Sequence, residues 1–295
     1  MSDTLESLRR KINGATDLES VVRTMKVLAA SNIIQYEKAV ISLADYYRTV
    51  ELGLFVCLQN RSGLTMAEKQ ARKQPENIGA IVFGSDQGLV GQFNEILAKF
   101  TGNKLYNFQG KKQIWAVGER MQGRLEDDGL PLSGSFSVPN SLNTITPLIG
   151  QILLESEMHY EKGEISQLFI FHNKPKPGAL YEPVMQRLLP LDKEWSNSAA
   201  HLKWPTNNIP ETIFGVASTL HGLIRQYLFI SLFRACAESM ASENASRLAA
   251  MQRAEKNIDE LLEDLNRSFH RLRQSTIDEE LFDVISGSEA LFKGK

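Results

Sequence analysis

The stretch from Leu223 to Ser286 contains neither glycine nor proline and keeps apolar residues at helical spacing along most of its length. It predicts one very long α-helix, because glycine and proline are the residues that most often end or interrupt a helix. At 1.5 Å per residue this helix would be roughly 100 Å long, several times the diameter of a small domain. A helix of that length needs a partner along its side.

An apolar stripe with alternating steps of three and four residues runs along this helix, which is the spacing of a coiled-coil seam. Four polar residues, Gln226, Asn244, Arg247 and Ser268, interrupt it. The whole stripe consists of Leu223, Gln226, Ile230, Phe233, Ala237, Met240, Asn244, Arg247, Met251, Ala254, Ile258, Leu261, Leu265, Ser268 and Leu272. The flanking faces carry mixed charge, which predicts a solvated surface. These charged residues are Arg253, Glu255, Lys256, Asp259, Glu260, Glu263, Asp264 and Arg267.

The other end of the chain carries a matching stripe, interrupted only by Glu19 and Lys26. It consists of Leu5, Leu8, Ile12, Ala15, Glu19, Val22, Lys26, Ala29, Ile33, Tyr36, Val40, Leu43, Tyr47, Val50 and Leu54. Two stripes of about fifty residues each predict that the chain ends pair as a long antiparallel two-helix coiled coil, with a compact domain inserted between them. The alternative, two amphipathic helices of a larger bundle, leaves the lack of a third long helix unexplained.

The composition sets limits on the class of protein. The chain has 295 residues, of which 42% are hydrophobic and 23% charged, and its formal net charge is -2. We expect a soluble protein with room for a domain of about 100 to 150 residues in addition to the two-helix coiled coil. The near-neutral charge gives no case for nucleic acid as the main partner. The sequence contains no run of about 18 apolar residues, so we expect no direct membrane insertion. The N-terminus resembles neither a secretory signal nor a transit peptide, so a bacterial-type cytoplasm is expected.

The two cysteines, Cys57 and Cys236, belong to no CxxC pair or metal-ligand cluster. Both have apolar neighbours within helical patterns. Free buried thiols are therefore favoured over a disulfide or a redox switch.

The middle of the chain alternates short apolar runs with helical patterns, which predicts a small, mainly parallel, Rossmann-like α/β sheet. The predicted strands are 78–83, 113–117, 166–171 and 182–189, and the predicted helices are 93–100, 119–127 and 142–160. Residues 59–77 are predicted to be a linker, and 192–210 an irregular connection packed down by Trp195 and Trp204. These assignments predict three domains: an N-terminal coiled-coil helix (1–58), an α/β domain (78–190) and a C-terminal coiled-coil helix (210–287).

The glycine-rich turn from Gly84 to Gly91 follows the first predicted strand, where a phosphate could bind at a helix N-terminus. Its spacing matches neither GxGxxG nor GxxxxGK[ST], and no lysine lies where a phosphate-binding one would be. We therefore favour a structural interpretation over phosphate binding: the glycines permit a tight, close-packed turn.

No catalytic or metal-binding pattern stands out. The five histidines, His159, His172, His201, His221 and His270, form no HxxxH or HExxH pair. The acidic pairs Glu155 with Glu157 and Glu279 with Glu280 are best explained as solvated helix faces. We predict no catalytic residue, no metal and no cofactor, and hence no independent enzyme.

Three blocks of residues carry a resemblance to a known family. The first runs from Leu8 to Ile12 with Thr24 to Ser31, and the second comprises Ser85-Asp86-Gln87-Gly88-Leu89 with Gly91 and Asn94. The third runs from Ala241 to Leu248, with Ala250, Met251, Arg273, Gln274, Ile277, Glu280, Leu281, Ile285, Ser286 and Gly287. Together they resemble the gamma subunit of F-type rotary ATP synthases, over both long helices and the first βα unit.

The resemblance implies a non-catalytic central rotor shaft that couples proton or sodium flow through the membrane rotor to ATP synthesis or hydrolysis in the catalytic hexamer. It implies as partners the alpha and beta subunits, the epsilon subunit and the membrane rotor ring of c subunits, with a peripheral location on the cytoplasmic face of the bacterial plasma membrane. The segment after Leu272 would project as a shaft tip. By the same resemblance, the residues facing the catalytic subunits would be Met25, Lys26, Arg247, Arg273, Gln274 and Glu280.

The sequence differs from the family's common pattern at several positions. Asn32, Ile33, Ile34 and Gln35 replace the usual basic residues, Gln87 replaces arginine, and Val90 stands where cysteine is frequent. These differences favour a divergent branch, such as the alternate bacterial type. Two other classes stay open, namely a static coiled-coil adaptor with an α/β interaction domain and an α/β nucleotide-dependent enzyme with a helical extension.

Overall fold

A computed structural model describes residues 4–59, 77–177, 179–191, 195, 204, 206, 208, 211–212 and 215–293. Its contacts divide the chain into two compact units, one formed by residues 30–247 and the other by residues 1–29 with 248–295. The predicted linker and most of the predicted 192–210 connection lie outside the described residues.

The unit of residues 30–247 is built on a five-stranded sheet. Its strands are β1 (Ile78–Phe83), β2 (Lys112–Val117), β3 (Leu132–Phe136), β4 (Gln167–Lys176) and β5 (Ala179–Leu189). The strand order is β3-β2-β1-β4-β5. Only β5 runs antiparallel to its neighbour, so the sheet is mainly parallel.

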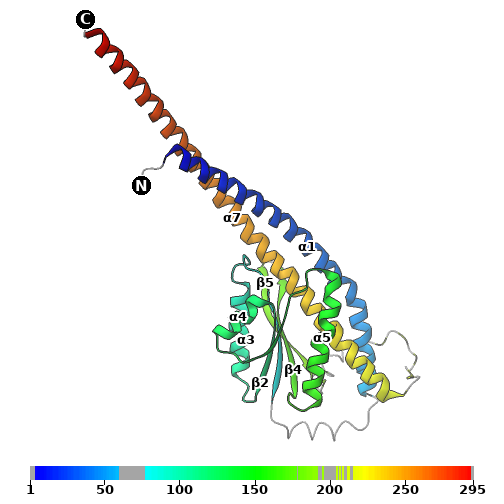
Figure 1. Ribbon diagram of the computed structural model, residues 1–295. Helices are drawn as coiled ribbons and strands as arrows, with labels where there is room; N and C mark the ends of the chain where they lie inside the picture. The colour runs from blue at the N-terminus through cyan, green and yellow to red at the C-terminus, as the bar shows by residue number, and fades with distance from the viewer. Residues whose placement is uncertain are drawn as a thin grey trace. The chain divides into compact units, whose positions relative to one another are not determined.

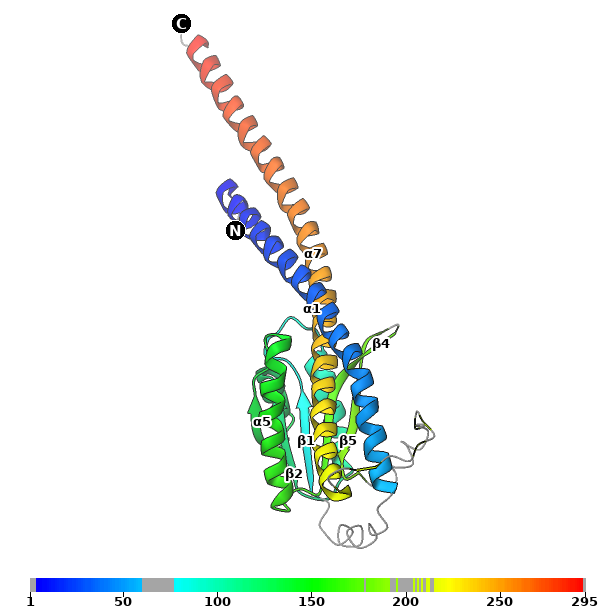
Figure 2. The same ribbon diagram turned by 90° about the vertical axis from the view of Figure 1, so that its right-hand side faces the viewer.

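Helices cover both faces of this sheet, as Figures 1 and 2 show. One face packs against α3 (Phe93–Tyr106) and α4 (Glu119–Asp127), and the other against α5 (Leu142–Glu161). Parts of α1 (Leu5–Gln59) and α7 (Val216–Lys293) lie on the same face as α5. All six residues of β1 are buried because the strand is covered on both sides, which explains its uninterrupted apolar sequence.

The mixed α/β fold with long terminal helices confirms the fold class expected from the sequence. Strand β1 and helix α4 have the predicted bounds, while α3 extends six residues beyond the predicted end at Phe100. Strand β3 was missed, because Leu132-Ser-Gly-Ser-Phe136 lacks an apolar run and alternates half-buried with exposed positions at the sheet edge. Helix α7 begins at Val216 rather than near 210. The division into three domains stays a prediction.

Within the same unit the two long helices run antiparallel. Asn32 donates a hydrogen bond to Asn244 (3.3 Å), and further along α1 Tyr46 donates one to Gln226 (2.8 Å). The residue number rises on one helix as it falls on the other, as the paired stripes predicted. Of the two tryptophans predicted to pack the connection down, Trp195 does so, with its Nε1 atom 3.2 Å from the hydroxyl of Tyr227, whereas Trp204 is 40% exposed.

The unit of residues 1–29 and 248–295 contains the outer parts of α1 and α7. On α1 the predicted stripe is correct, since Leu8, Ala15 and Ala29 are buried. On α7 the stripe is wrong at two positions, because Leu261 is 50% exposed and Ser268 is exposed. Between Ile258 and Leu272 the half-buried positions are Ile258, Leu262, Leu265, Phe269 and Leu272.

This difference is confined to alternate positions of the stripe. Ile258, Leu265 and Leu272 keep their predicted seven-residue spacing, whereas Leu262 and Phe269 are half-buried in place of Leu261 and Ser268. Residues three and four positions further along a helix lie on nearly the same face, so the steps after Ile258 and after Leu265 could each be three or four. At the second of these steps Phe269 offers the large apolar side chain that Ser268 lacks.

The C-terminal part of α7 has a different environment. Thr276 is still half-buried, whereas every residue from Ile277 to Ser286 is exposed. The exposure predicted after Leu272 thus begins one helical turn later. No helix in the described ranges combines the length and apolarity needed to cross a membrane.

Candidate functional site

The carboxyl ends of β1 and β4 form the sheet edge where α/β proteins commonly bind ligands. Helix α7 closes this edge with three buried serines. The hydroxyls of Ser239, Ser242 and Ser246 donate hydrogen bonds to the carbonyl oxygens of Phe83 (3.0 Å), Asn173 (3.0 Å) and Val90 (2.6 Å), respectively. The spacing of three and four residues places the serines on one face of the helix.

The glycine-rich turn uses its polar groups for internal contacts. The carboxylate of Asp86 accepts hydrogen bonds from the backbone nitrogens of Glu119 (2.9 Å) and Val138 (3.0 Å). The side chain of Asn94 accepts from the Ser85 nitrogen (3.1 Å) and donates to the Ser85 hydroxyl (2.8 Å). Asp86 thereby joins the start of α4 to the segment after β3.

Two glycines at or near this turn are required by close packing. A Cβ atom at Gly84 would lie 2.3 Å from the Cβ of Met121. Gly118 has a φ of 112°, and a Cβ atom there would lie 2.7 Å from the Ser85 backbone. Neither position accommodates a side chain without movement of the neighbouring elements. This geometry supports the packing interpretation of the glycines.

A buried histidine and glutamate link β4 to α7. The Nε2 atom of His172 lies 2.8 Å from Glu238, which also accepts a hydrogen bond from Arg234 (2.8 Å). Burial lowers the pKa of His172 and favours the neutral ring, which donates from Nε2. Burial alone would raise the pKa of Glu238, but the hydrogen bonds from His172 and Arg234 lower it, so the carboxylate is charged.

Arg247, predicted as a charge that interrupts the seam, is paired along its own helix. Its guanidinium lies 2.6 Å from Glu243, one turn earlier, and the two side chains are 12% and 8% exposed. The pKa of Glu243 is raised, mainly by burial and also by the nearby carboxylate of Asp86, and the contact with Arg247 only partly opposes this. Arg247 therefore has a carboxylate partner while its Nε atom is buried without one.

A second charged cluster joins α1 to α7 in the other unit. The Lys26 ammonium lies 2.5 and 2.8 Å from the two carboxylate oxygens of Glu255. Arg23 lies 3.8 Å from Glu255 and 2.5 Å from Glu19. The hydrogen bond from Lys26 lowers the pKa of Glu255, so this carboxylate is charged at neutral pH.

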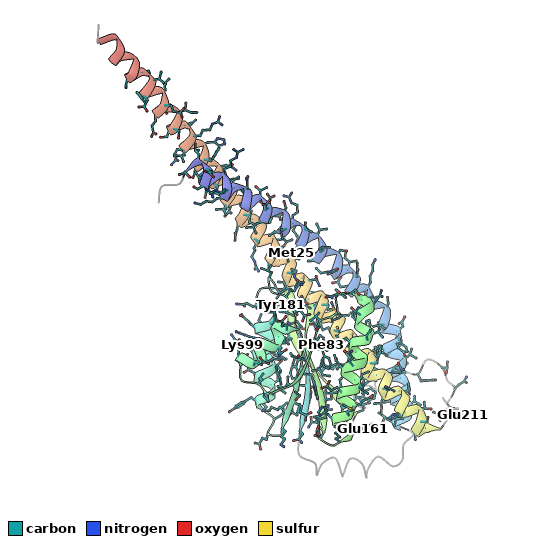
Figure 3. All side chains as sticks on the ribbon, viewed as in Figure 1. Met25, Phe83, Lys99, Glu161, Tyr181 and Glu211 are labelled. Atoms are coloured by element: carbon teal, nitrogen blue, oxygen red, sulfur yellow. The ribbon has the colours of Figure 1, made fainter. Side chains whose placement is uncertain are left out.

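The other predicted contact residues have different settings. Met25 is half-buried on α1 (Figure 3). Arg273, Gln274 and Glu280 are exposed on α7. Of the predicted set, Lys26 is the residue that bridges the two helices in this unit.

Sequence reasoning missed Glu255, which was placed on the solvated flank of the coiled coil. The structure shows it half-buried beside Lys26. The available signal was the interruption of the apolar stripe by Lys26, because a cation at a seam position requires a nearby carboxylate. A second missed group, the three serines of α7, had only their helical spacing as a signal.

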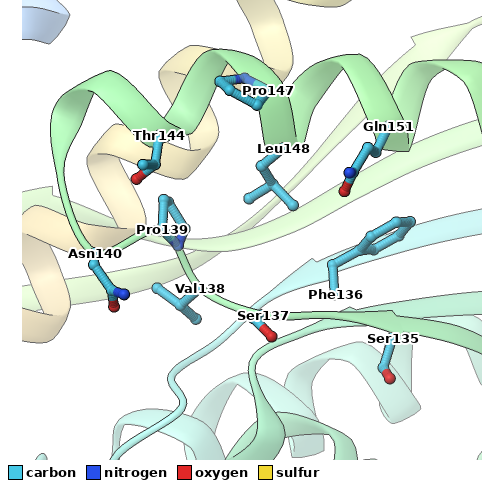
Figure 4. A pocket seen from close by; sticks show the side chains of 10 residues that line it. All are labelled: Ser135, Phe136, Ser137, Val138, Pro139, Asn140, Thr144, Pro147, Leu148 and Gln151. Carbon is cyan, nitrogen blue, oxygen red and sulfur yellow. The ribbon is translucent and has the colours of Figure 1, made fainter.

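An open pocket of about 420 Å³ lies between β3 and the start of α5 (Figure 4). Thr144, Pro147, Leu148 and Gln151 line it from α5, and residues 135–140 line the opposite side. The lining contains no ionisable side chain. The pocket therefore provides no group for acid–base chemistry.

Both cysteines are free and buried, as predicted. Burial raises the pKa of Cys57 and of Cys236, which keeps both thiols protonated and unreactive at neutral pH. Among the described residues, no group of three or more His, Cys, Asp or Glu side chains is arranged to hold a metal ion.

Comparison with known proteins places these features in a family. The family model described as ATP synthase matches residues 4–291. The ATP synthase gamma chain of Dechloromonas aromatica is 28% identical over 293 residues, covering 97% of this chain and 99% of the relative. That of Desulfitobacterium hafniense is 26% identical, covering 96% and 98%.

Solved structures show the same fold at low sequence identity. A chain of the Euglena gracilis mitochondrial ATP synthase, in a structure of its OSCP, F1 and c-ring, has a TM-score of 0.63 at 15% identity and covers 99% of this chain and 95% of its own length. A chain from the central stalk and c-ring of the Tetrahymena thermophila enzyme has a TM-score of 0.56 at 20% identity, covering 79% and 99%. Together with the match of the family model, these findings show that the chain belongs to the ATP synthase family, whose gamma chains it matches along nearly their whole length.

Proposed function

We propose that this chain is the central rotor shaft of an F-type ATP synthase. It couples proton or sodium flow through a membrane rotor to ATP synthesis or hydrolysis in a catalytic hexamer. The observation that carries the proposal is an exposed stretch of α7, where residues 277–286 follow Thr276, the last half-buried position up to Ser286. The exposed large apolar residues there are Ile277, Leu281, Phe282, Val284 and Ile285. Exposed apolar clusters mark interaction surfaces, and a shaft end needs such a surface where it contacts the subunits that form its bearing.

The chain itself performs no catalysis in this proposal. Its partners are the alpha and beta subunits of the hexamer, the epsilon subunit and the ring of c subunits, which the α/β domain grips. The complex places the chain at the cytoplasmic face of a bacterial plasma membrane, as a peripheral subunit. The internal engagement of Asp86 supports the non-catalytic role, because this carboxylate already accepts two backbone hydrogen bonds.

The contact residues fall into two groups. Arg273, Gln274 and Glu280 are exposed and contact the catalytic subunits directly. Lys26 and Arg247 each have a carboxylate partner within the chain, so their contacts with other subunits compete with an internal ion pair. Met25 accompanies Lys26 on α1.

The composition of the purified complex provides the first test. Purification from the native host is expected to yield a hexameric ATPase with one copy of this chain for every three catalytic subunits. The pure chain is expected to hydrolyse no ATP, and the hexamer to need it for efficient hydrolysis. ATP hydrolysis by the pure chain that disappears in Asp86→Asn would overturn the non-catalytic assignment.

A cross-linking experiment distinguishes a rotating shaft from a static adaptor. We would replace Cys57 and Cys236 with serine, introduce Asp278→Cys on the exposed end of α7, and place a cysteine on the facing surface of one catalytic subunit. A disulfide reports contact, because it requires Cα atoms about 4.4 to 6.8 Å apart. After reduction, ATP turnover and reoxidation, labelled and unlabelled catalytic subunits should exchange at the cross-link, and they should not exchange without nucleotide. Recapture of the same subunit during full-rate turnover would favour the static adaptor.

A further inference from the structure

The charged cluster of Glu19, Arg23, Lys26 and Glu255 is neutral as a whole and alternates in sign. Glu19 contacts Arg23, Arg23 contacts Glu255, and Glu255 contacts Lys26. Glu255 is the only member contributed by α7, and it contacts both cations of the cluster, Arg23 and Lys26. The cluster therefore depends on Glu255 for the neutralisation of Lys26.

The geometry of the pair indicates a strong preference of Lys26 for this partner. The ammonium bridges both oxygens of the carboxylate, at 2.5 and 2.8 Å, and the two side chains are only 30% and 20% exposed. A charge-assisted, two-oxygen contact of this kind is stronger than a neutral hydrogen bond. Lys26 nevertheless keeps part of its surface accessible, so a carboxylate outside the chain can approach it.

We propose that Glu255 is a positioning residue that acts as the internal counter-ion of Lys26 and Arg23, so that the shaft passes carboxylates of the surrounding subunits without forming a lasting ion pair. This inference rests on the proposed function as a rotating shaft. A cation that binds one neighbouring carboxylate too well holds the shaft at one angle, because the contact must break before the next step. Glu255 weakens each such contact by competing for the same ammonium.

The test uses the assembled complex carrying Glu255→Gln, which removes the negative charge and keeps the side-chain size. ATP hydrolysis is measured at about 0.1 M and about 1 M salt, where the Debye length is roughly 10 Å and 3 Å. We expect kcat to fall about two- to fivefold at the lower salt concentration, the range that corresponds to one partly exposed ion pair. The loss should disappear at the higher concentration, with KM for ATP unchanged.

Two further variants make the result specific. Lys26→Met combined with Glu255→Gln should raise kcat at low salt above that of Glu255→Gln alone and remove the difference between the two salt concentrations, because the unpaired cation is gone. Glu260→Gln is the matched control, since Glu260 lies one turn further along α7, is exposed and contacts only Lys256 at 3.8 Å among the ion pairs of the described residues. It should change kcat at neither salt concentration.

The outcomes separate this inference from the proposed function. If Glu255→Gln behaves like Glu260→Gln while the chain still exchanges catalytic neighbours during turnover, the counter-ion role is overturned and the shaft stands. A loss of activity that is equal at both salt concentrations and is not restored by Lys26→Met also overturns it, because the role of Glu255 would then be structural. Normal turnover without neighbour exchange overturns the shaft itself.

Discussion

The attachment of α7 to the sheet edge by three serines leads to a quantitative prediction. Replacing Ser239, Ser242 and Ser246 with alanine removes one hydrogen bond each to a carbonyl oxygen in a buried setting. A lost hydrogen bond of this kind costs about 1 to 2 kcal/mol. Alanine returns about 0.5 kcal/mol through its higher helix propensity. The expected net loss is therefore about 0.5 to 1.5 kcal/mol for each serine.

The triple variant should lose about 2 to 4 kcal/mol in free energy of unfolding if the three effects nearly add. In Ser246→Ala the acceptor keeps one partner, because the Val90 carbonyl also accepts a hydrogen bond from the Phe93 nitrogen (3.3 Å). Urea unfolding followed by circular dichroism measures the total. Native-state hydrogen exchange shows where the loss occurs, and amides of the turn at 84–91 should exchange faster in the triple variant.

Ser218→Ala is the matched control, because Ser218 is exposed on the same helix. It should leave stability unchanged or raise it by about 0.5 kcal/mol, through helix propensity alone. A triple variant that loses less than about 0.5 kcal/mol would refute the view that these hydroxyls fasten α7 to the sheet. So would unchanged exchange at the turn combined with faster exchange elsewhere.

Burial and backbone geometry lead to three further predictions. Met251→Ala should destabilise the chain by about 2 to 4 kcal/mol, because the side chain is buried. Leu261→Ala should cost about 1 kcal/mol or less, because its side chain is half-exposed, and similar costs for the two variants in urea unfolding would contradict the exposure of Leu261. Gly118→Ala should lower the free energy of unfolding by about 2 kcal/mol or more in the same assay. The reasons are that φ is 112° and that the new Cβ atom would collide with the Ser85 backbone, so an unchanged stability would exclude that collision. Burial raises the pKa of Tyr36 to about 12, so the unfolded chain loses this proton first and stability should fall as pH rises from about 10 to about 12. Tyr36→Phe should reduce this alkaline loss, and an equal loss in the variant would exclude Tyr36 as its source.

Local patterns were sufficient for the elements that are uniform along the chain. The absence of glycine and proline between Leu223 and Ser286 predicted the long helix, because helix formation depends on each residue and its near neighbours. The apolar run of β1 likewise predicted a strand covered on both faces. The matching lengths of the two stripes predicted that the helices pair, and the compact domain expected between them favoured the antiparallel direction.

Residues far apart in sequence decided the remaining features. Strand β3 has no apolar run of its own and exists because β2 offers it an edge for pairing. On α7, Leu262 and Phe269 are half-buried in place of Leu261 and Ser268, because residues three and four positions apart lie on nearly the same helix face and packing decides between them.

The candidate site shows the same division. The resemblance of short blocks indicated the family. The ion pair of Glu243 with Arg247 was not predicted, although their four-residue spacing is visible in the sequence and suits a pair on one helix face. The partner of Lys26 was not readable, because Glu255 is 229 positions away along the chain. The sequence alone determined which residues carry charge at a seam. Only the tertiary structure decided which opposite charge each one meets, because electrostatic pairing depends on distance in space rather than along the chain.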